Sequence, residues 1–286
     1  MADFASSVVV NHALYVAMSR AFGTVDWKPS NDFQRMVVRH SLDSLLVALQ
    51  ITSDQLFSKA AHDAETVNRF LRENEFALQL QDMGSGPKMA YVASILKLLG
   101  KFYERGLTGY HLPKAERPAF RLGNGAGTTH FDAESKWLVR IPTDGGFDFW
   151  LTSPNHTHGF SMIDDWISML RVAKLKSGSG VILPMVTIAE TSVDISRLVG
   201  MTSGEIILQQ ALAAAKFALT PEFVKFEMAA AMSAKRGWAF EMRPLTDDYV
   251  ADHALYFALA LRDMSPLMPL AVGMVDMDEF SRTELH

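Results

Sequence analysis

The chain has 286 residues, of which 49% are hydrophobic, and its 27 basic and 32 acidic side chains give a formal net charge of −5. The charges are mixed and no basic run is longer than Lys235 and Arg236, which argues against a nucleic-acid surface. The chain contains no cysteine, which excludes thiol catalysis, thiolate metal sites and disulfides.

The N-terminal segment 1–22 has no basic lead and no long apolar stretch, so we expect no signal peptide. No run of the sequence approaches the 18 or so apolar residues of a membrane-spanning helix. We therefore expect a soluble protein without membrane partners, either cytoplasmic or released without a visible signal peptide.

Helical patterns dominate the first third of the chain. Apolar residues recur at helical spacing over 8–19, and Gly23 stops that run. Five leucines predict an amphipathic helix over 41–56 with Ser41 as its N-cap. Residues 64–80 also have a helical pattern, whereas the apolar stretch 90–99 fits either a helix or a buried strand.

Strand patterns become frequent after residue 118. Short apolar runs at 137–141 and 147–151 flank Thr-Asp-Gly-Gly, which predicts a hairpin, and 181–188 has the pattern of a strand. Strong helix formers predict a helix over 206–219. Residues 255–261 and 267–275 predict a closing hairpin. Helices that precede most of the strands, without an internal repeat or linker, indicate a single α+β domain over 1–286.

Familiar catalytic motifs are weak here. The glycines at 123, 125 and 127 lack the Gly-Lys-Ser/Thr ending of a phosphate loop, so we interpret them as a solvent loop. His156 and His158 have the spacing of a metal pair on one strand face, but no carboxylate motif completes it, and a polar loop is the favoured interpretation. The sequence thus predicts no catalytic residues, no cofactor and no metal, and by these routes it does not indicate an enzyme.

Residues 224–234 alternate between apolar and other side chains. The apolar set comprises Val224, Phe226, Met228, Ala230, Met232 and Ala234. Period two is typical of a strand with one buried face, although the alanines at 229–231 also favour helix. The stretch could be an ordinary strand, a short helix, or a segment that joins a sheet only under certain conditions.

Five stretches of the chain, in the same order, resemble motifs of the serpin superfamily. Residues 41–49 resemble the motif Ser-Pro-x-Ser-Ile-x-x-Ala-Leu. Residues 181–201 resemble the strand motif Leu-Pro-x-Phe-x-Ile and the helix that follows that strand in serpins. Residues 137–151 resemble the hairpin that precedes the same strand. Residues 216–231 resemble the strand that leads into the reactive loop and its alanine-rich hinge, and 252–275 resembles the serpin C-terminal motif.

This resemblance implies a metastable fold with N-terminal helices, a large, mostly antiparallel central sheet, smaller second sheets and a mobile reactive loop. It implies a serine protease inhibitor whose loop is cleaved by the target, which could also be a protease of another class, and then inserts into the central sheet as a new strand. The residues that it implies for the hinge are Phe226, Glu227, Met228, Ala229, Ala230, Ala231 and Met232. Those implied for the sheet-opening region are Ser41, Ser44 and Ala215.

The scissile bond stays open between three interpretations. Counting from the hinge places it near Ala239 and Phe240. Counting back from Asp252 places it near Arg243, although Pro244 would protect that bond from trypsin-like enzymes. The most trypsin-cleavable stretch is Lys235-Arg236-Gly237.

Several departures from the serpin pattern keep two other functions open. Leu42 replaces a motif proline, Ala215 stands where the family usually has a histidine, and Lys225 and Phe226 replace small hinge residues. We expect Phe226 to overpack the sheet on insertion at a cost of about 1–3 kcal/mol. A non-inhibitory serpin-like binding protein is the first alternative, and an unrelated α+β metal-dependent enzyme that uses the His156 and His158 region is the second.

Overall fold

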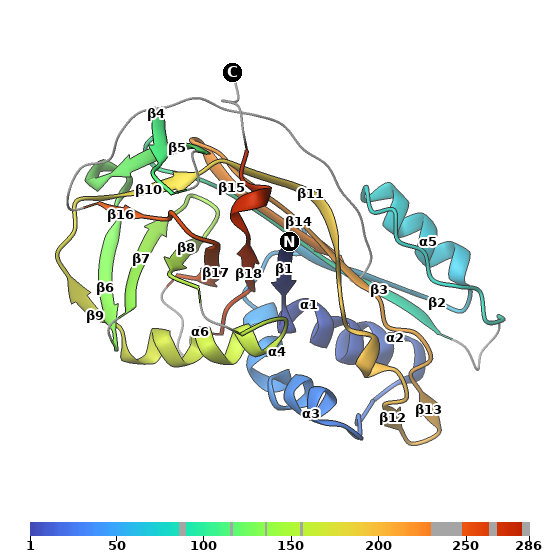
Figure 1. Ribbon diagram of the computed structural model, residues 1–286. Helices are drawn as coiled ribbons and strands as arrows, with labels where there is room; N and C mark the ends of the chain where they lie inside the picture. Colours follow the sequence, from blue (N-terminus) through green and yellow to red (C-terminus); the bar gives the residue numbers. More distant parts are fainter. Residues whose placement is uncertain are drawn as a thin grey trace.

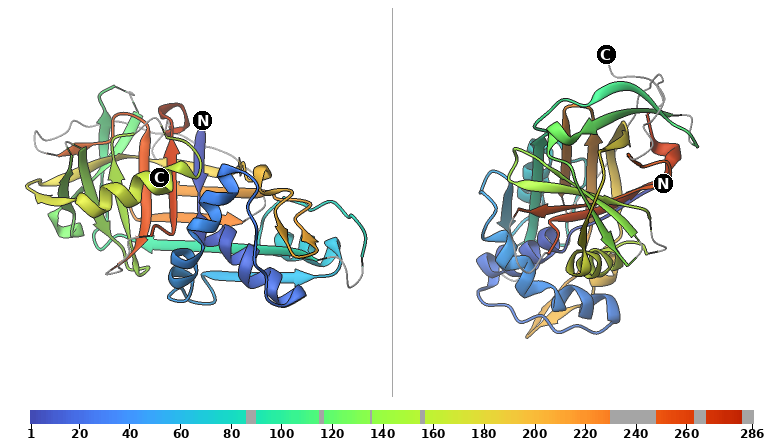
Figure 2. Two further views of the ribbon diagram at one scale, coloured as in Figure 1. Left: turned by 90° about the horizontal axis from the view of Figure 1, so that it is seen from below. Right: turned by 90° about the vertical axis from the view of Figure 1, so that its left-hand side faces the viewer.

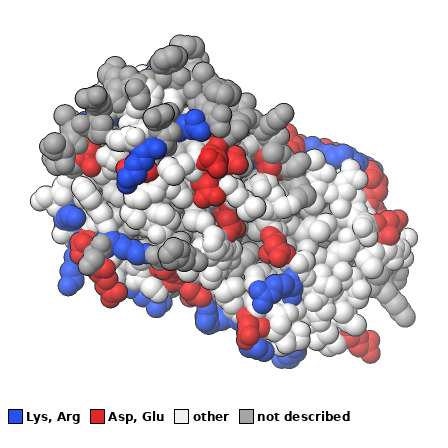
Figure 3. Space-filling view, viewed as in Figure 1, with Lys and Arg blue, Asp and Glu red and all other residues white. Residues whose placement is uncertain are grey.

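The computed structural model describes residues 1–85, 90–114, 117–134, 136–154, 157–229, 248–262 and 268–281. Two large sheets form the framework of this part of the chain, with helices packed against them (Figure 1). Acidic and basic side chains are interspersed over the face seen in Figure 3. None of the described helices is long and apolar enough to cross a membrane.

A five-stranded antiparallel sheet runs along the length of the molecule in the order β11-β14-β15-β3-β2 (Figure 1). It places strands from distant parts of the sequence next to one another. Their bounds are β2 Leu56–Ala61, β3 Tyr91–Lys101, β11 Val186–Val193, β14 Ala213–Leu219 and β15 Phe223–Ala229.

A seven-stranded antiparallel sheet has the order β1-β18-β17-β8-β7-β6-β9. Its strands come from the first residues, the middle and the end of the chain. The bounds are β1 Ala2–Ala5, β6 Thr129–Ala133, β7 Lys136–Pro142, β8 Phe147–Thr152, β9 Lys174–Lys176, β17 Leu255–Leu261 and β18 Ala271–Val275. The predicted hairpins at 137–151 and 255–275 are therefore confirmed as β7–β8 and β17–β18.

A four-stranded sheet, β16-β10-β5-β4, and a small β12–β13 hairpin complete the strands. The two strands β10 and β16 are parallel, which is the exception among the described pairs. The bounds are β4 Leu107–Leu112, β5 Arg117–Gly123, β10 Gly180–Pro184, β12 Thr202–Ser203, β13 Ile206–Ile207 and β16 Tyr249–Val250. The glycine-rich stretch after Leu122 forms the 3-10 turn η2, Asn124–Ala126, between β5 and β6.

The N-terminal helical stretch is continuous through a π-helical segment. It comprises α1 Ser7–Asn11, η1 His12–Ala17 and α2 Met18–Phe22. The Ser6 hydroxyl caps α1 by accepting from the Val9 N–H. Gly23 ends the stretch at φ 77°, a conformation that favours glycine. The predicted helix over 8–19 and its stop are confirmed.

Four more helices surround the sheets. They are α3 Asp32–Arg39, α4 Ser41–Ala48, α5 Ala64–Glu73 and α6 Ser161–Val172. The short 3-10 turns η3 Ser196–Leu198 and η4 Met277–Glu279 follow β11 and β18. Seen from below, α1–α4 and α6 lie in front of the strands (Figure 2, left). Ser41 is not an N-cap, because α3 leads into α4 through His40, which has helical dihedral angles.

The two faces of the five-stranded sheet are covered by different helices. On β3, the residues at 91, 93 and 95 pack in a core cluster with α5, whereas Leu96 and Leu98 belong to the main core. η1 contacts β3 from the main-core side. Alternation along the strand thus sends successive side chains toward α5 and toward the N-terminal helices.

The structure corrects two sequence expectations and decides a third that was open. Residues 206–219, expected as a helix, form β13, an irregular stretch and the strand β14. The strand expected at 181–188 is two strands in two sheets, divided at Met185. The ambiguous stretch 90–99 is strand β3. Pairing within a buried sheet has overridden the helix propensity of the alanines in β14.

Phenylalanines join the two large sheets. The ring of Phe4 lies 6.2 Å from Phe217, 5.9 Å from Phe226 and 6.2 Å from Phe257, measured between centroids. The rings of Phe217 and Phe257 are stacked at 4.4 Å. A Cβ at Gly273 would lie 2.5 Å from the Phe4 ring, so only glycine leaves room for this cluster.

Candidate functional site

The strand β15 contains the first part of the alternating segment and lies in the middle of the five-stranded sheet. It pairs with β14 on one side, from Leu219–Val224 to Ala214–Ala229. On the other side it pairs with β3, from Lys101–Phe223 to Ile95–Ala229. The period-two pattern is therefore confirmed as a strand for these residues. β15 follows β14 directly, through a tight turn at 220–222.

The Thr220 hydroxyl holds that turn. It accepts hydrogen bonds from the backbone N–H groups of Glu222 and Phe223, at 3.3 and 3.2 Å. Pro221 follows Thr220, and its fixed φ suits a turn. The turn sets the register that places Phe226 opposite Phe217.

One face of β15 is built into the main core. Val224, Phe226 and Met228 have no exposed surface, and the Phe226 ring meets Phe4 edge-on. The expectation that Phe226 would overpack the sheet is not met here, because the Phe4 cluster accommodates its ring. Full burial of such side chains contributes about 1.5–3 kcal/mol each.

The other face of β15 carries a buried carboxylate. Glu227 is 5% exposed and lies 3.7 Å from the Lys216 ammonium and 3.2 Å from that of Lys225. Lys216 is opposite Glu227 on β14, donates to the Glu75 carbonyl oxygen at 2.9 Å and lies over the Phe76 ring. Two cations thus compensate the burial of this carboxylate.

The sheet around β15 extends past its last described residue. β3 continues through residues 91–94 beyond the pair of Ile95 with Ala229, and these four residues pair with β2 on their far side. β14 continues to Ala213, which pairs with Val193 of β11. In line with β15 beyond Ala229, the described neighbours are β3 at 91–94 and, for one residue, β14 at Ala213.

The predicted hinge and scissile residues fall partly on this strand. Phe226, Glu227, Met228 and Ala229 are the last four residues of β15, in the sheet rather than in an exposed loop. The other hinge residues and all candidate scissile residues lie outside the described residues, namely Ala230, Ala231, Met232, Lys235, Arg236, Ala239, Phe240 and Arg243.

Known structures share this arrangement of strands and helices over nearly the whole chain. A structure described as "Cleaved Serpin 42Da" matches with a TM-score of 0.57 and 14% identity, over 96% of this chain and 91% of that one. The latent state of the thermophilic serpin tengpin matches with a TM-score of 0.52 and 12% identity, over 99% and 92%. The fold is that of a serpin.

The serpin fold also contains proteins with a binding function. A structure of thyroxine-binding globulin in complex with thyroxine matches this chain with a TM-score of 0.53 and 10% identity, over 98% of this chain and 93% of that one. No protein-family model matches the sequence, and a comparison with curated protein sequences finds no match. At these identities the likeness establishes the serpin-like fold alone.

The three residues that the serpin resemblance implies for sheet opening occupy different places. Ala215 is on β14 with no exposed surface, opposite Met228. Ser41 and Ser44 are on α4, which packs against α1, α3 and η1. On the main-core side, β3 is contacted by α1 and by η1, and the sequence did not reveal the role of η1.

His12 provides the polar contact between η1 and the sheet. Its Nδ1 atom lies 2.9 Å from the hydroxyl of Ser94 on β3. Burial, together with the Arg20 charge, lowers the pKa of His12 to about 4. His12 is therefore neutral at pH 7 and bonds to the strand that flanks β15.

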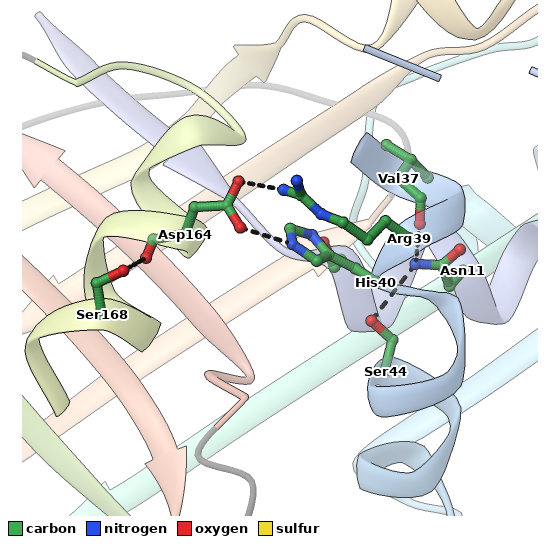
Figure 4. A network of polar contacts seen from close by, with 8 residues as sticks. Asn11, Val37, Arg39, His40, Ser44, Asp164 and Ser168 are labelled. Carbon is green, nitrogen blue, oxygen red and sulfur yellow. Dashed lines mark hydrogen bonds and ion pairs between the residues drawn. The ribbon is translucent and has the colours of Figure 1, made fainter. Parts of the chain in front are cut away.

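A second polar network joins three helices of this serpin-like fold (Figure 4). His40, between α3 and α4, has its Nδ1 atom 3.2 Å from the Ser7 hydroxyl and its Nε2 atom 2.9 Å from an Asp164 oxygen. Arg39 contacts the other Asp164 oxygen. The network links α1, the α3–α4 junction and α6.

Serine, histidine and aspartate in contact also occur in hydrolases, but this network is built differently. Ser7 has no exposed surface and His40 is buried, so the hydroxyl does not reach a substrate. The serine is also on Nδ1 and the aspartate on Nε2, the reverse of the hydrolase order. We interpret the network as a structural link.

The predicted histidine pair has one described member. His158 is exposed, and its Nδ1 atom lies 3.4 Å from an Asp3 oxygen. His156 lies outside the described residues. Within the described part of the chain, no three histidine or acidic side chains are grouped as a metal site.

Proposed function

We propose that this protein is a serpin-like inhibitor of a serine protease, or of another protease class, and that cleavage within 230–247 lets the segment after Ala229 extend β15. The observation that carries the proposal is the position of β15 between β14 and β3, with β3 running on past Ala229. An inserted segment would add hydrogen bonds to both neighbours, as in other cases of β-strand addition.

The sequence after Ala229 supports an extension in this direction. Ala230, Ala231 and Met232 are small or flexible, so they suit a packed sheet better than large rigid side chains would. Arg236 sets a limit, because a buried unpaired charge is expensive. We propose that insertion proceeds at least to Met232.

In this proposal the protein acts without catalytic residues of its own, and the cleavage chemistry belongs to the protease. The candidate scissile residues stay those given by the sequence, between Lys235 and Arg243. We also propose that residues 1–286 act as a single domain, which is supported by a core cluster that extends from Phe4 to Phe280.

A panel of serine proteases with different specificities tests the proposal. We expect at least one protease to form a complex that survives SDS, together with a C-terminal fragment whose N-terminal sequence identifies the scissile bond. Cleavage by every active member of the panel without such a complex would contradict inhibition.

A pair of variants separates insertion from cleavage. Continued alternation places Met232 on the core-facing side with Met228, and Ser233 on the opposite side. We expect Met232→Glu to be cleaved without forming the complex, since insertion would bury a charge, whereas Ser233→Glu retains the complex. Equal complex formation by both variants would count against insertion as far as Met232.

A non-inhibitory serpin-like binding protein is the second candidate. It is favoured by one observation: the uncut chain already has Phe223–Ala229 in the sheet, held by Phe226 and by the ion pairs of Glu227. Less insertion is then left to drive a conformational change. Cleavage without a protease complex and without a gain in thermal stability is the result expected of this candidate.

A further inference from the structure

An apolar cavity of about 550 Å³ lies between the N-terminal helices and the start of β3. The helices α1, η1 and α2 contribute Val10, Leu14 and Met18 to its lining, and Trp27 also lines it. The rest of the lining includes Val92 of β3 and residues 205–212, which lead into β14. A cavity of about 300–1,000 Å³ is the size that holds a small organic molecule.

Three polar side chains of the lining are hydrogen-bonded to protein groups. The Trp27 indole N–H donates to the Leu14 carbonyl oxygen at 2.8 Å. The Tyr91 hydroxyl donates to the Gly84 carbonyl oxygen at 2.8 Å and accepts from the Met83 N–H at 2.7 Å. The Gln210 amide is bonded to the backbone of Gln81. The cavity therefore offers mainly hydrocarbon surface to an occupant.

Charge is almost absent from the lining. Among the described lining residues Glu205 is the one charged side chain, and it is exposed. The neighbouring face between α5 and the β12–β13 hairpin also shows few charged side chains (Figure 3). A charged ligand would lose its hydration without gaining a partner, whereas an apolar ligand would gain from leaving water.

We propose that this cavity binds an uncharged, largely hydrocarbon small molecule, such as a long-chain alcohol. Binding would bridge the N-terminal helices, β3 and the stretch before β14. Val92 and the residues before β14 also border the line along which the proposed inhibition would extend β15, so the ligand site proposed here belongs to the uncut protein. Its test uses that uncut protein without a protease, and its outcome does not depend on whether an inhibitory complex forms.

Trp27 supplies a direct readout. Titration with 11-bromo-1-undecanol, below its aggregation concentration, is expected to quench part of the tryptophan fluorescence in a saturable manner, because bromine would lie against the indole. The Trp27→Phe variant is expected to lose that saturable component while still binding. Quenching that does not saturate, or that is unchanged in Trp27→Phe, would overturn the proposal.

Cavity-filling variants in two different elements of the lining test the same site. We expect Ala13→Phe and Ala211→Phe each to weaken binding of 1-dodecanol at least tenfold, measured by the rise in melting temperature that the alcohol produces. The control Ala77→Phe, at an exposed alanine outside the lining, is expected to bind as the wild type does. Unchanged binding in both filling variants, or no effect of dodecanol on the wild type, would contradict the assignment.

Discussion

Glu227 is a buried carboxylate in the centre of a sheet, and the ammonium groups of two lysines lie beside it. Its contacts with Lys216 and Lys225 are at 3.7 and 3.2 Å, and the Lys216 side chain is the less exposed of the two, at 16% against 43%. A cation left without its partner near the core is costly, whereas an exposed cation regains water.

We therefore expect Glu227→Gln to lower the free energy of unfolding by about 1–3 kcal/mol. The control Lys225→Gln should lower it by less than about 1 kcal/mol, because the Lys225 side chain is partly exposed. Urea unfolding of the three proteins at pH 7 measures both changes. If both substitutions lowered the free energy of unfolding equally, the burial of Glu227 would not explain the contribution of its ion pairs.

His12 makes stability depend on pH. Its pKa is lowered from 6.5 to about 4 by burial, with a further contribution from Arg20, so the unfolded chain binds the proton more tightly. The contribution of neutral His12 is complete above pH 6.5 and is lost as the pH falls from about 6.5 to 4.

When the pH is lowered from 7.5 to 5, we expect His12 to reduce the free energy of unfolding by about 2 kcal/mol. Denaturant unfolding of the wild type and of His12→Asn at both pH values isolates the contribution of His12, since all other ionisable groups are common to the two proteins. The variant should lose less stability on acidification than the wild type does. Parallel losses in the two proteins would contradict the role given to His12.

At the scale of elements, the integration of β15 into the sheet can be measured by hydrogen exchange. Its amides lie between two strands, so we expect them to exchange as slowly as those of β3 at 96–98. The exposed edge strand β9 is the internal reference for fast exchange. Exchange in β15 as fast as in β9 would mean that the segment is not held in the sheet in solution.

The sequence predicted an element correctly where its apolar residues follow one clear period. It was less reliable where the residue types are compatible with both helix and strand. Alternation along 224–229 predicted β15, and the apolar spacing over 8–19 predicted the N-terminal helical stretch. Residues 213–219 were expected in a helix because alanine and leucine favour it, but pairing on both sides makes them β14. Local propensity does not contain that information.

The polar contacts between elements were not visible in the sequence. Ser7 and Asp164 are 33 and 124 residues away from His40, and His12 is 82 residues away from Ser94. No spacing rule links such positions before the topology is known. The location of the candidate site could be predicted from alternation and family resemblance, whereas its partners Lys216, Phe4 and β3 required the fold.

At the scale of the whole molecule, the two large sheets share one core. The Phe4 ring contacts Phe217 and Phe226 of the five-stranded sheet and Phe257 of the seven-stranded sheet. A strand that lengthens between β14 and β3 would therefore pack against elements from both ends of the chain. Its effect on stability should be global rather than confined to the cleaved segment.

The melting temperature before and after limited cleavage within residues 230–247 tests the central claim most directly. If the freed segment extends β15, the cleaved but still associated protein should melt about 10 °C higher, which corresponds to about 6 kcal/mol for a chain of this size. A melting temperature that is unchanged or lower after cleavage, with both fragments present, would contradict insertion into the five-stranded sheet.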